Sequence, residues 1–161
     1  MAIVLARVDN RLIHGQVLEA WVPYVRATSI VVVDDIVAQD AFRRQLMQAV
    51  VPSTIAVQIC SHEQIPELCK SLDSAKENVL VLFANPNSAL QAYLRGLVFK
   101  ALNLGNMHIG EHKCCISKTL YMDTHDLQAL EQLAQCGVDI SAQCIPTDKV
   151  LHWDCNCRSL R

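Results

Sequence analysis

The sequence lacks a long hydrophobic run. In 161 residues, no apolar stretch approaches the roughly 18 residues that a membrane-spanning helix requires. The first ten residues, MAIVLARVDN, have neither a basic start nor a small-residue cleavage site, so they are not typical of a secretory signal peptide. We therefore expect a cytoplasmic protein.

An excess of charge of one sign is also missing. Lys and Arg number 14 and Asp and Glu 16, which gives a formal net charge of -2. Nucleic-acid-binding domains usually carry a clustered basic surface, so we expect no nucleic-acid partner. Hydrophobic residues make up 52% of the chain, which favours a folded domain with a core over a disordered chain.

Cysteine is not scarce, since the chain has 8. Disulfides rarely persist in the cytosol, so we expect most of these residues to behave as small apolar side chains. His152, Cys155 and Cys157 resemble a partial metal set, but a structural zinc ion usually takes four ligands. We predict neither a metal nor another cofactor.

Apolar runs rich in Val, Ile and Leu alternate with amphipathic segments. The runs predict strands buried on both faces of a parallel sheet, at residues 3–8, 29–33, 54–60, 79–84, 101–104, 114–117 and 139–145. Helical spacing of apolar residues predicts helices at residues 16–25, 39–50, 62–72, 87–97 and 124–136. This alternation predicts an α/β fold, with an open, mostly parallel sheet and helices on both faces.

Residues 101–117 are the exception to the alternation. The segment 105–111 leaves no room for a crossover helix between two strands. We therefore expect one antiparallel strand near residues 112–118, paired with residues 101–104. We predict a single domain over residues 1–150. Residues 151–161 show no periodicity, so we predict an irregular C-terminal tail there.

The stretch RVDNRLIHGQV, residues 7–17, carries the residues best suited to chemistry. It follows the first predicted strand, at the end where open α/β sheets bind ligands. His14 can attack phosphorus near neutral pH, and Arg11 can donate two hydrogen bonds to phosphate oxygens. Asp9 can hold Arg11 or orient the imidazole by accepting its other N–H. This combination indicates a site for phosphoryl transfer.

The next two residues add to that interpretation. Gly15 lets the backbone approach a ligand closely, and the backbone N–H groups of Gly15 and Gln16 open a helix whose N-terminus suits phosphate. Taken singly, each residue also fits an ordinary role: His14 as a surface or capping residue, Arg11 as a solvated cation and Gly15 as a turn.

The stretch resembles the signature around the phosphorylated histidine in IIB components of the mannose/fructose/sorbose family of the sugar phosphotransferase system, where R-[IV]-D-[DN]-R-L-I-H-G-Q-V is typical. The resemblance covers about residues 1–150. It includes VVDD at 32–35, LFANP at 82–86, LNLGNM at 102–107 and IPTD at 145–148. Asn106 stands where the family usually has a second glycine.

The resemblance implies a single IIB phosphocarrier domain that acts as a phosphotransferase, from protein phosphohistidine to sugar. His14 would accept phosphate on Nδ1 from a IIA phosphocarrier domain, and Arg11 would contact the phosphoryl group. The acceptor would be a sugar bound by the membrane permease IIC/IID, with which the chain would associate peripherally. The identity of the sugar and formation of a homo-oligomer stay open.

Two other functions also stay open. One is a regulatory phosphocarrier that is charged on His14 without delivering phosphate to a sugar. The other is a degenerate binding module of the same fold, against which the intact Arg11, His14 and Gly15 argue.

Overall fold

A computed structural model describes residues 2–74, 77–154 and 159–160. Within them lies an eight-stranded sheet in the order β10-β9-β8-β5-β1-β4-β2-β3. Six of these strands run parallel. They are β1 (Ala2–Asp9), β2 (Ser29–Val33), β3 (Ala56–Cys60), β4 (Asn78–Phe83), β5 (Ala101–Asn106) and β8 (Asp139–Ala142). The prediction of an α/β fold with a mostly parallel sheet is confirmed.

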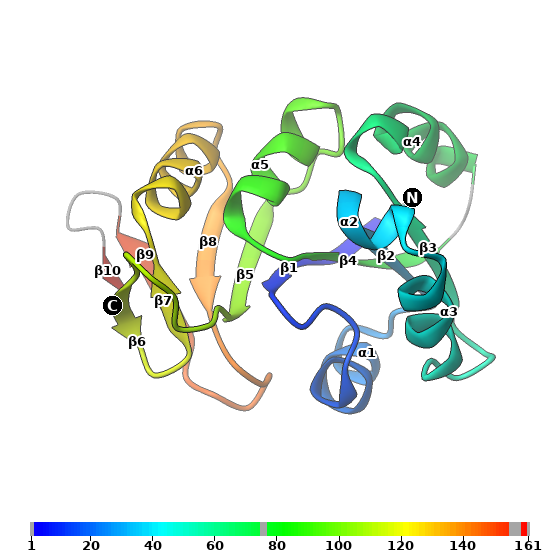
Figure 1. Ribbon diagram of the computed structural model, residues 1–161, viewed down its shortest axis with the longest axis horizontal. Helices are drawn as coiled ribbons and strands as arrows, with labels where there is room; N and C mark the ends of the chain where they lie inside the picture. The colour runs from blue at the N-terminus through cyan, green and yellow to red at the C-terminus, as the bar shows by residue number, and fades with distance from the viewer. Residues whose placement is uncertain (1, 75–76, 155–158, 161) are drawn as a thin grey trace.

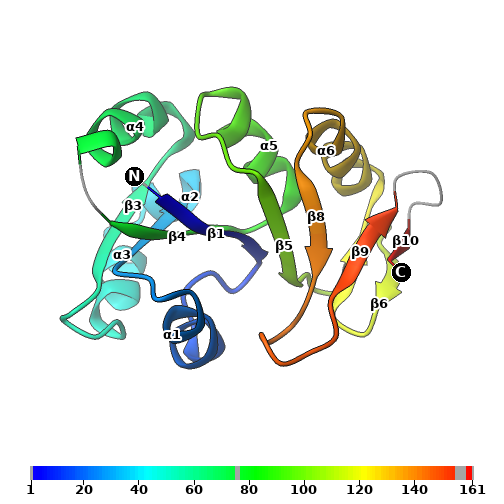
Figure 2. The same ribbon diagram turned by 180° about the vertical axis from the view of Figure 1, so that it is seen from behind.

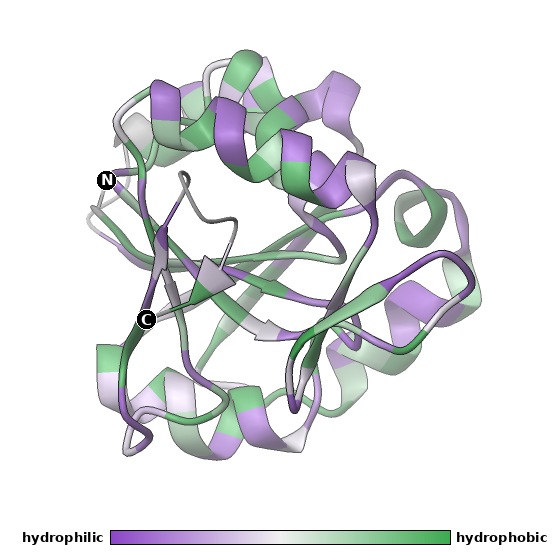
Figure 3. Cartoon of the chain, turned by 90° about the vertical axis from the view of Figure 1, so that its left-hand side faces the viewer, coloured by the Kyte–Doolittle hydropathy of each residue, from purple (hydrophilic) through white to green (hydrophobic). Residues whose placement is uncertain are grey.

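Helices cover both faces of the sheet, and Figure 3 shows it between two helical layers. On one face lie α1 (Val22–Val25), which continues the π-helical turn η1 (Val17–Trp21), and α3 (Ala41–Ala49). On the other face lie α4 (Ile65–Ser74), which follows the 3-10 turn η2 (His62–Gln64), α5 (Pro86–Leu94) and α6 (Thr124–Gln135) (Figures 1 and 2). In the described part of the chain, no helix combines the length and the apolar character needed to cross a membrane.

Alternate residues of the central strands build two separate cores, because successive side chains of a strand point to opposite faces. Val31 and Val33 of β2 belong to the core under α4, α5 and α6. Ile30 and Val32 belong to the core on the face of α1. All four side chains are fully buried, as expected for a strand covered by helices on both sides.

The helix predicted at residues 39–50 is α3, and a short helix that was not predicted, α2 (Asp35–Gln39), precedes it. The break is at Asp40, which has extended backbone and whose carboxylate accepts a hydrogen bond from the N–H of Arg43 at 3.0 Å. Such a side chain starts a new helix by capping it. On α3, Met47 packs against the core while Phe42 is 72% exposed.

The strand expected near residues 112–118 is antiparallel, but its predicted partner was wrong. β6 (Cys114–Ser117) pairs with β7 (Leu120–Met122) in a separate hairpin, not with β5. A hairpin closes a far shorter loop than pairing with β5 would, so its entropic cost is smaller. Leu120 and Met122, which alternate with Tyr121, are buried, but three residues are too few to stand out in the sequence.

The prediction of an irregular C-terminal tail was also wrong for the described residues. β9 (Leu151–Asp154) adds to the sheet antiparallel to β8, and β10 (Ser159–Leu160) pairs with β9. Leu151 and Trp153 pack against the core, which gives this segment the two-residue period of a strand. Cys155 and Cys157 lie outside the described residues.

Candidate functional site

The residues singled out in the sequence lie where β1 and β5 end side by side. The chain leaves β1 towards the face of α1 and leaves β5 towards the face of α6. A crevice between neighbouring parallel strands whose connections diverge is the usual ligand site of an open α/β sheet. The backbone joins the two ends here, because Asn10 N–H donates to the carbonyl of Asn106 at 3.0 Å.

The loop after β1 is fixed by its own backbone and by two apolar side chains. Leu12 N–H donates to the carbonyl of Asp9 at 2.8 Å, and Leu12 has a left-handed backbone with φ 55°. This conformation is unfavourable for a residue other than glycine. Burial of Leu12 and Ile13 in the core on the α1 face holds the loop in place. The structure thus positions the residue that follows, His14.

His14 lies at the junction of this loop and the first helix. Its carbonyl accepts from the N–H groups of Val17 and Leu18 at 3.0 and 3.1 Å. The amides of Gly15 and Gln16 therefore precede the first of these helical bonds, where N–H groups lack a partner within the helix.

The His14 ring meets the buried carboxylate of Asp9. Nε2 of His14 lies 3.1 Å from Oδ2 of Asp9, and the two side chains are 15% and 0% exposed. A carboxylate at this distance favours the tautomer with hydrogen on Nε2. The lone pair of the neutral ring is then on Nδ1.

Asp9 contacts two arginines as well. Its Oδ2 accepts from Nη2 of Arg7 at 3.0 Å, and its Oδ1 accepts from the backbone N–H of Arg11 at 3.2 Å. Burial by itself raises the pKa of Asp9, but the adjacent His14 ring and the charge of Arg7 outweigh it and leave the pKa below its ordinary value. Asp9 is therefore a buried anion at neutral pH.

Arg11 and Gln16 lie on the solvent side of the site. The Arg11 side chain is 43% exposed, and its Nε lies 3.6 Å from Oδ1 of Asp9. Its Nη2 donates to Oε1 of Gln16 at 3.3 Å. The structure thus brings together all five residues predicted for the site, since Gly15 lies between His14 and Gln16. Apart from its chain neighbours and the backbone of its own helix, a Cβ added at Gly15 would meet no atom within 4 Å, so the space beside it is open.

Arg7 is the residue that the sequence interpretation missed. It belongs to the recognised motif but received no role, although a charged side chain between Ala6 and Val8 in an apolar run was a visible signal. It is fully buried. Its carbonyl partners come from Gln143 and Cys144, which no local pattern could have connected with it.

Asn106 supports the loop in an unexpected way. It stands where the family usually has a second glycine, but Asn106 is not among the described residues with positive φ. Instead its Nδ2 donates to Oδ1 of Asn10 at 2.9 Å. Its side chain therefore ties the end of β5 to the start of the His14 loop.

The two carboxylates that follow β2 have structural partners. Asp34 caps α2 by accepting from Val37 N–H at 2.8 Å. Asp35 accepts from His62 N–H at 2.8 Å and lies 3.0 Å from His62 Nδ1. The backbone hydrogen bond from His62 outweighs the effect of burial and lowers the pKa of Asp35. These carboxylates join elements at the end of the sheet.

His62 also contacts Ser88, which gives an arrangement like that of a serine hydrolase. His62 Nε2 lies 3.0 Å from Ser88 Oγ. The hydroxyl group is buried, however, and donates to the carbonyl of Val33 at 3.1 Å. A serine nucleophile needs its proton directed at the histidine, so the group acts as a structural link between β2, η2 and α5.

In the described residues, no three potential ligands from His, Cys, Asp and Glu lie close enough together to hold a metal ion. His152 lies on β9 with Nδ1 3.6 Å from Asp139. The other members of its predicted set, Cys155 and Cys157, are outside the described residues.

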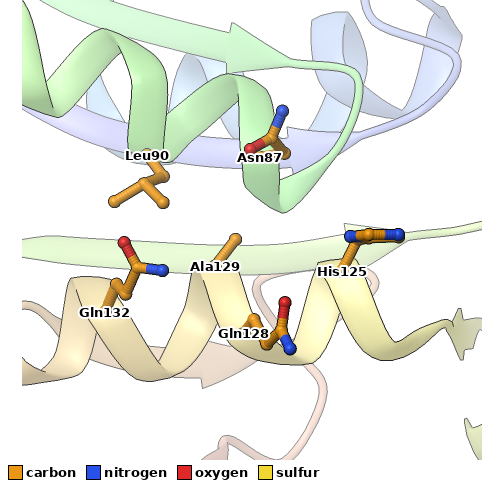
Figure 4. A pocket seen from close by; sticks show the side chains of 6 residues that line it. All are labelled: Asn87, Leu90, His125, Gln128, Ala129 and Gln132. Atoms are coloured by element: carbon orange, nitrogen blue, oxygen red, sulfur yellow. The ribbon is translucent and has the colours of Figure 1, made fainter.

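The surface has one hollow that lies away from the site and another that adjoins it. One of about 200 Å³ lies between α5 and α6 (Figure 4), and none of its lining residues belongs to the predicted site. Another, of about 440 Å³, is lined by Gln143 and Cys144 and by residues of the β6–β7 hairpin. It adjoins the site, because these two residues accept hydrogen bonds from Arg7.

Comparison with known proteins adds independent findings. Residues 3–158 match the family model described as the PTS system sorbose subfamily IIB component. The fructose-specific EIIB component of Bacillus subtilis is 33% identical over 148 residues, which cover 92% of this chain and 91% of that protein. The mannose-specific EIIAB component of Escherichia coli is 30% identical over 94% of this chain, and the match covers 47% of that longer protein.

The fold has a solved counterpart. The crystal structure of the IIBSor domain of the sorbose permease from Klebsiella pneumoniae is similar with a TM-score of 0.87 at 32% identity, and the match covers 93% of this chain and 92% of that one.

Proposed function

This chain belongs to the sorbose subfamily of IIB components of the sugar phosphotransferase system (PTS), and from that premise we propose that His14 is its phosphoryl carrier. His14 accepts a phosphoryl group from the phosphohistidine of a IIA domain and passes it to a sugar bound by the membrane components IIC and IID. The name of the E. coli relative joins an A and a B component in one chain, which supports a IIA donor.

The observation that carries the proposal is the pairing of His14 with Asp9. With Nε2 held 3.1 Å from Asp9 Oδ2, Nδ1 has the lone pair and acts as the nucleophile. Its attack forms an Nδ1–P bond while the N–P bond of the donor breaks and the donor ring leaves with the electron pair. His14 is then an imidazolium that keeps hydrogen on Nε2, and the Asp9 carboxylate stabilises its positive charge, as an aspartate does for a catalytic histidine.

The second step returns His14 to its starting state. A sugar hydroxyl oxygen attacks phosphorus and its proton is given up to solvent, while the Nδ1–P bond breaks and the electron pair goes back to Nδ1. In both steps the phosphoryl oxygens carry the charge, so catalysis depends on positioned donors. Arg11 supplies a guanidinium on the solvent side, and the backbone amides of Gly15 and Gln16 supply two N–H groups.

Phosphotransfer from phosphoenolpyruvate, through the general PTS proteins and a IIA domain, tests the proposal by mass spectrometry. The wild type should gain one acid-labile phosphate and His14→Ala none. His125→Ala is a matched control, because His125 is also an exposed histidine but lies on α6, in the hollow between α5 and α6 that contains no residue of the site; it should be phosphorylated like the wild type. An acid-labile phosphate on His14→Ala, or none on the wild type with a charged IIA, contradicts the proposal.

A further inference from the structure

The guanidinium of Arg7 is a buried cation with partners on three separate segments. Nη1 donates to the side chain of Asn103 on β5 and to the carbonyl of Gln143 at 2.9 Å. Nη2 donates to Asp9 at 3.0 Å and to the carbonyl of Cys144 at 3.1 Å. The guanidinium is thereby fixed by β1, β5 and the segment after β8, which are the elements that surround the site.

The backbone of β5 makes room for this group at Gly105. A Cβ atom added to Gly105 would overlap Nη1, Nη2 and Cζ of Arg7. Gly105 does not have a positive φ, so the backbone conformation does not demand glycine here. The space occupied by Arg7 does.

An aromatic ring completes the surroundings. Cζ of Arg7 lies 4.8 Å from the centre of the Trp21 ring, which favours a cation. Trp21 Nε1 donates to the carbonyl of Cys144 at 3.0 Å, the same carbonyl that Arg7 contacts. The first helix, which begins after His14, is therefore joined to the Arg7 site as well.

One carboxylate oxygen links Arg7 to the reacting ring. Oδ2 of Asp9 lies 3.0 Å from Arg7 Nη2 and 3.1 Å from His14 Nε2. The position of this oxygen depends on Arg7, and the orientation of the imidazole depends on this oxygen. A displacement of about 1 Å in such a group can reduce a rate about 10²-fold.

Stability alone accounts poorly for this arrangement. A buried ion pair often contributes little net stability compared with apolar residues of similar volume. The Arg7 site has a buried charge, a glycine that it requires and partners far apart in the sequence. These features suit a guanidinium whose position is needed for the chemistry of the site.

We propose that Arg7 is a positioning residue for phosphotransfer: through Asp9 it holds the His14 ring with Nδ1 presented, and Gly105 provides its space. The proposal rests on the proposed function of His14, but its structural part can be tested without any phosphate.

The test uses two variants that disturb the guanidinium in different ways. Arg7→Lys keeps the charge but loses the planar fork of donors, and Gly105→Ala keeps Arg7 but takes its space. The control is Lys113→Met, which breaks another partly buried ion pair, Lys113 Nζ to Asp126 Oδ2 at 2.9 Å, between residues that are not in the site.

Two readouts separate a positioning role from a structural one. The ¹⁵N signals of His14 report which ring nitrogen has the hydrogen, and a single-turnover assay with phosphorylated IIA reports the transfer rate. Arg7→Lys and Gly105→Ala should lose the uniform Nε2–H tautomer and transfer about 10²-fold more slowly. Lys113→Met should keep both properties even where its melting temperature falls.

Wild-type tautomer and transfer rate in a folded Arg7→Lys or Gly105→Ala variant would overturn the proposal. If neither variant folds, the wild type decides, because hydrogen on Nδ1 of its His14 would equally refute the arrangement and a uniform Nε2–H tautomer supports it. A further outcome is that the wild type fails to accept phosphate while the variants still change the tautomer of the His14 ring. That result would count against the proposed function of His14 and not against the positioning role of Arg7.

Discussion

Arg11 is the cation of the site that remains in contact with solvent. With its side chain 43% exposed, Arg11→Ala should change the free energy of unfolding by no more than about 0.5 kcal/mol. Phosphotransfer should slow by about 10²- to 10³-fold, which is typical for loss of one donor to a charged transition state. Rapid-quench measurement of His14 phosphorylation checks this, with the exposed Arg43 on α3 changed to Ala as a control. An unchanged rate in Arg11→Ala would remove Arg11 from the mechanism.

Two glycines make a contrasting pair. An added Cβ at Gly15 meets no atom within 4 Å beyond its chain neighbours and its own helix backbone, whereas Gly137 has a left-handed backbone with φ 86°. Gly15→Ala should therefore keep its stability but transfer phosphate more slowly, because the Cβ enters the open space beside His14. Gly137→Ala should lose about 1–2 kcal/mol of stability, since alanine is unfavourable in that conformation, and keep its transfer rate.

Urea unfolding and single-turnover phosphorylation of both glycine variants check this pair. Normal transfer by Gly15→Ala would mean that the phosphoryl group and its donor approach from another side.

The sequence allowed us to predict which residues of one short motif form the site. It did not allow us to predict which distant residues hold that motif in place. Asp9, Arg11 and His14 lie within six positions, so their proximity follows from a single loop. Arg7 reaches Gln143 and Cys144 across 136 and 137 positions. Such contacts depend on the order of strands in the sheet, which local patterns do not specify.

At the scale of elements, the contacts of Asp35 with the backbone and ring of His62 join the start of α2 to the turn after β3. The lowered pKa of Asp35 means that its contribution to stability is present above the ordinary carboxyl pKa of about 3.9. This contribution is lost as the pH falls through the lower pKa of the folded state. Asp35→Asn should thus be less stable than the wild type at about pH 5, and the difference should shrink towards about pH 2.5.

Urea unfolding of both proteins at a series of pH values in this range gives the difference directly. A difference that stays constant, or grows on acidification, would mean that the ionised carboxylate of Asp35 does not stabilise the folded state.

The observed bounds of the strands agree with the predicted bounds where the apolar runs are long. β2 and β4 agree closely with the predicted strands, and α5 begins at Pro86 after the cap Asn85. α6 begins at Thr124 as predicted, after the cap Asp123, and ends one residue before the predicted end at residue 136, which is the usual scale of error at helix ends. The short strands β7, β9 and β10 escaped prediction because tertiary pairing, and not a long periodic pattern, defines them.

At the scale of the whole molecule, the sheet gathers the site from distant parts of the chain. β1 lies between β4 and β5, so the loop that carries His14 meets the end of β5 and the segment after β8. The sequence predicted a parallel sheet and a site at its carboxyl edge. The strand order, and with it the buried Arg7 behind Asp9, required the structure.

The central claim is that Asp9 holds Nε2 of His14 so that Nδ1 carries the phosphoryl group. Its most direct test is ³¹P and ¹⁵N NMR of the histidine-labelled chain after phosphorylation by a charged IIA domain. The account predicts one phosphate per chain, bonded to Nδ1 of His14, with hydrogen retained on Nε2. A phosphate on Nε2 of His14, or on any other histidine, would contradict it.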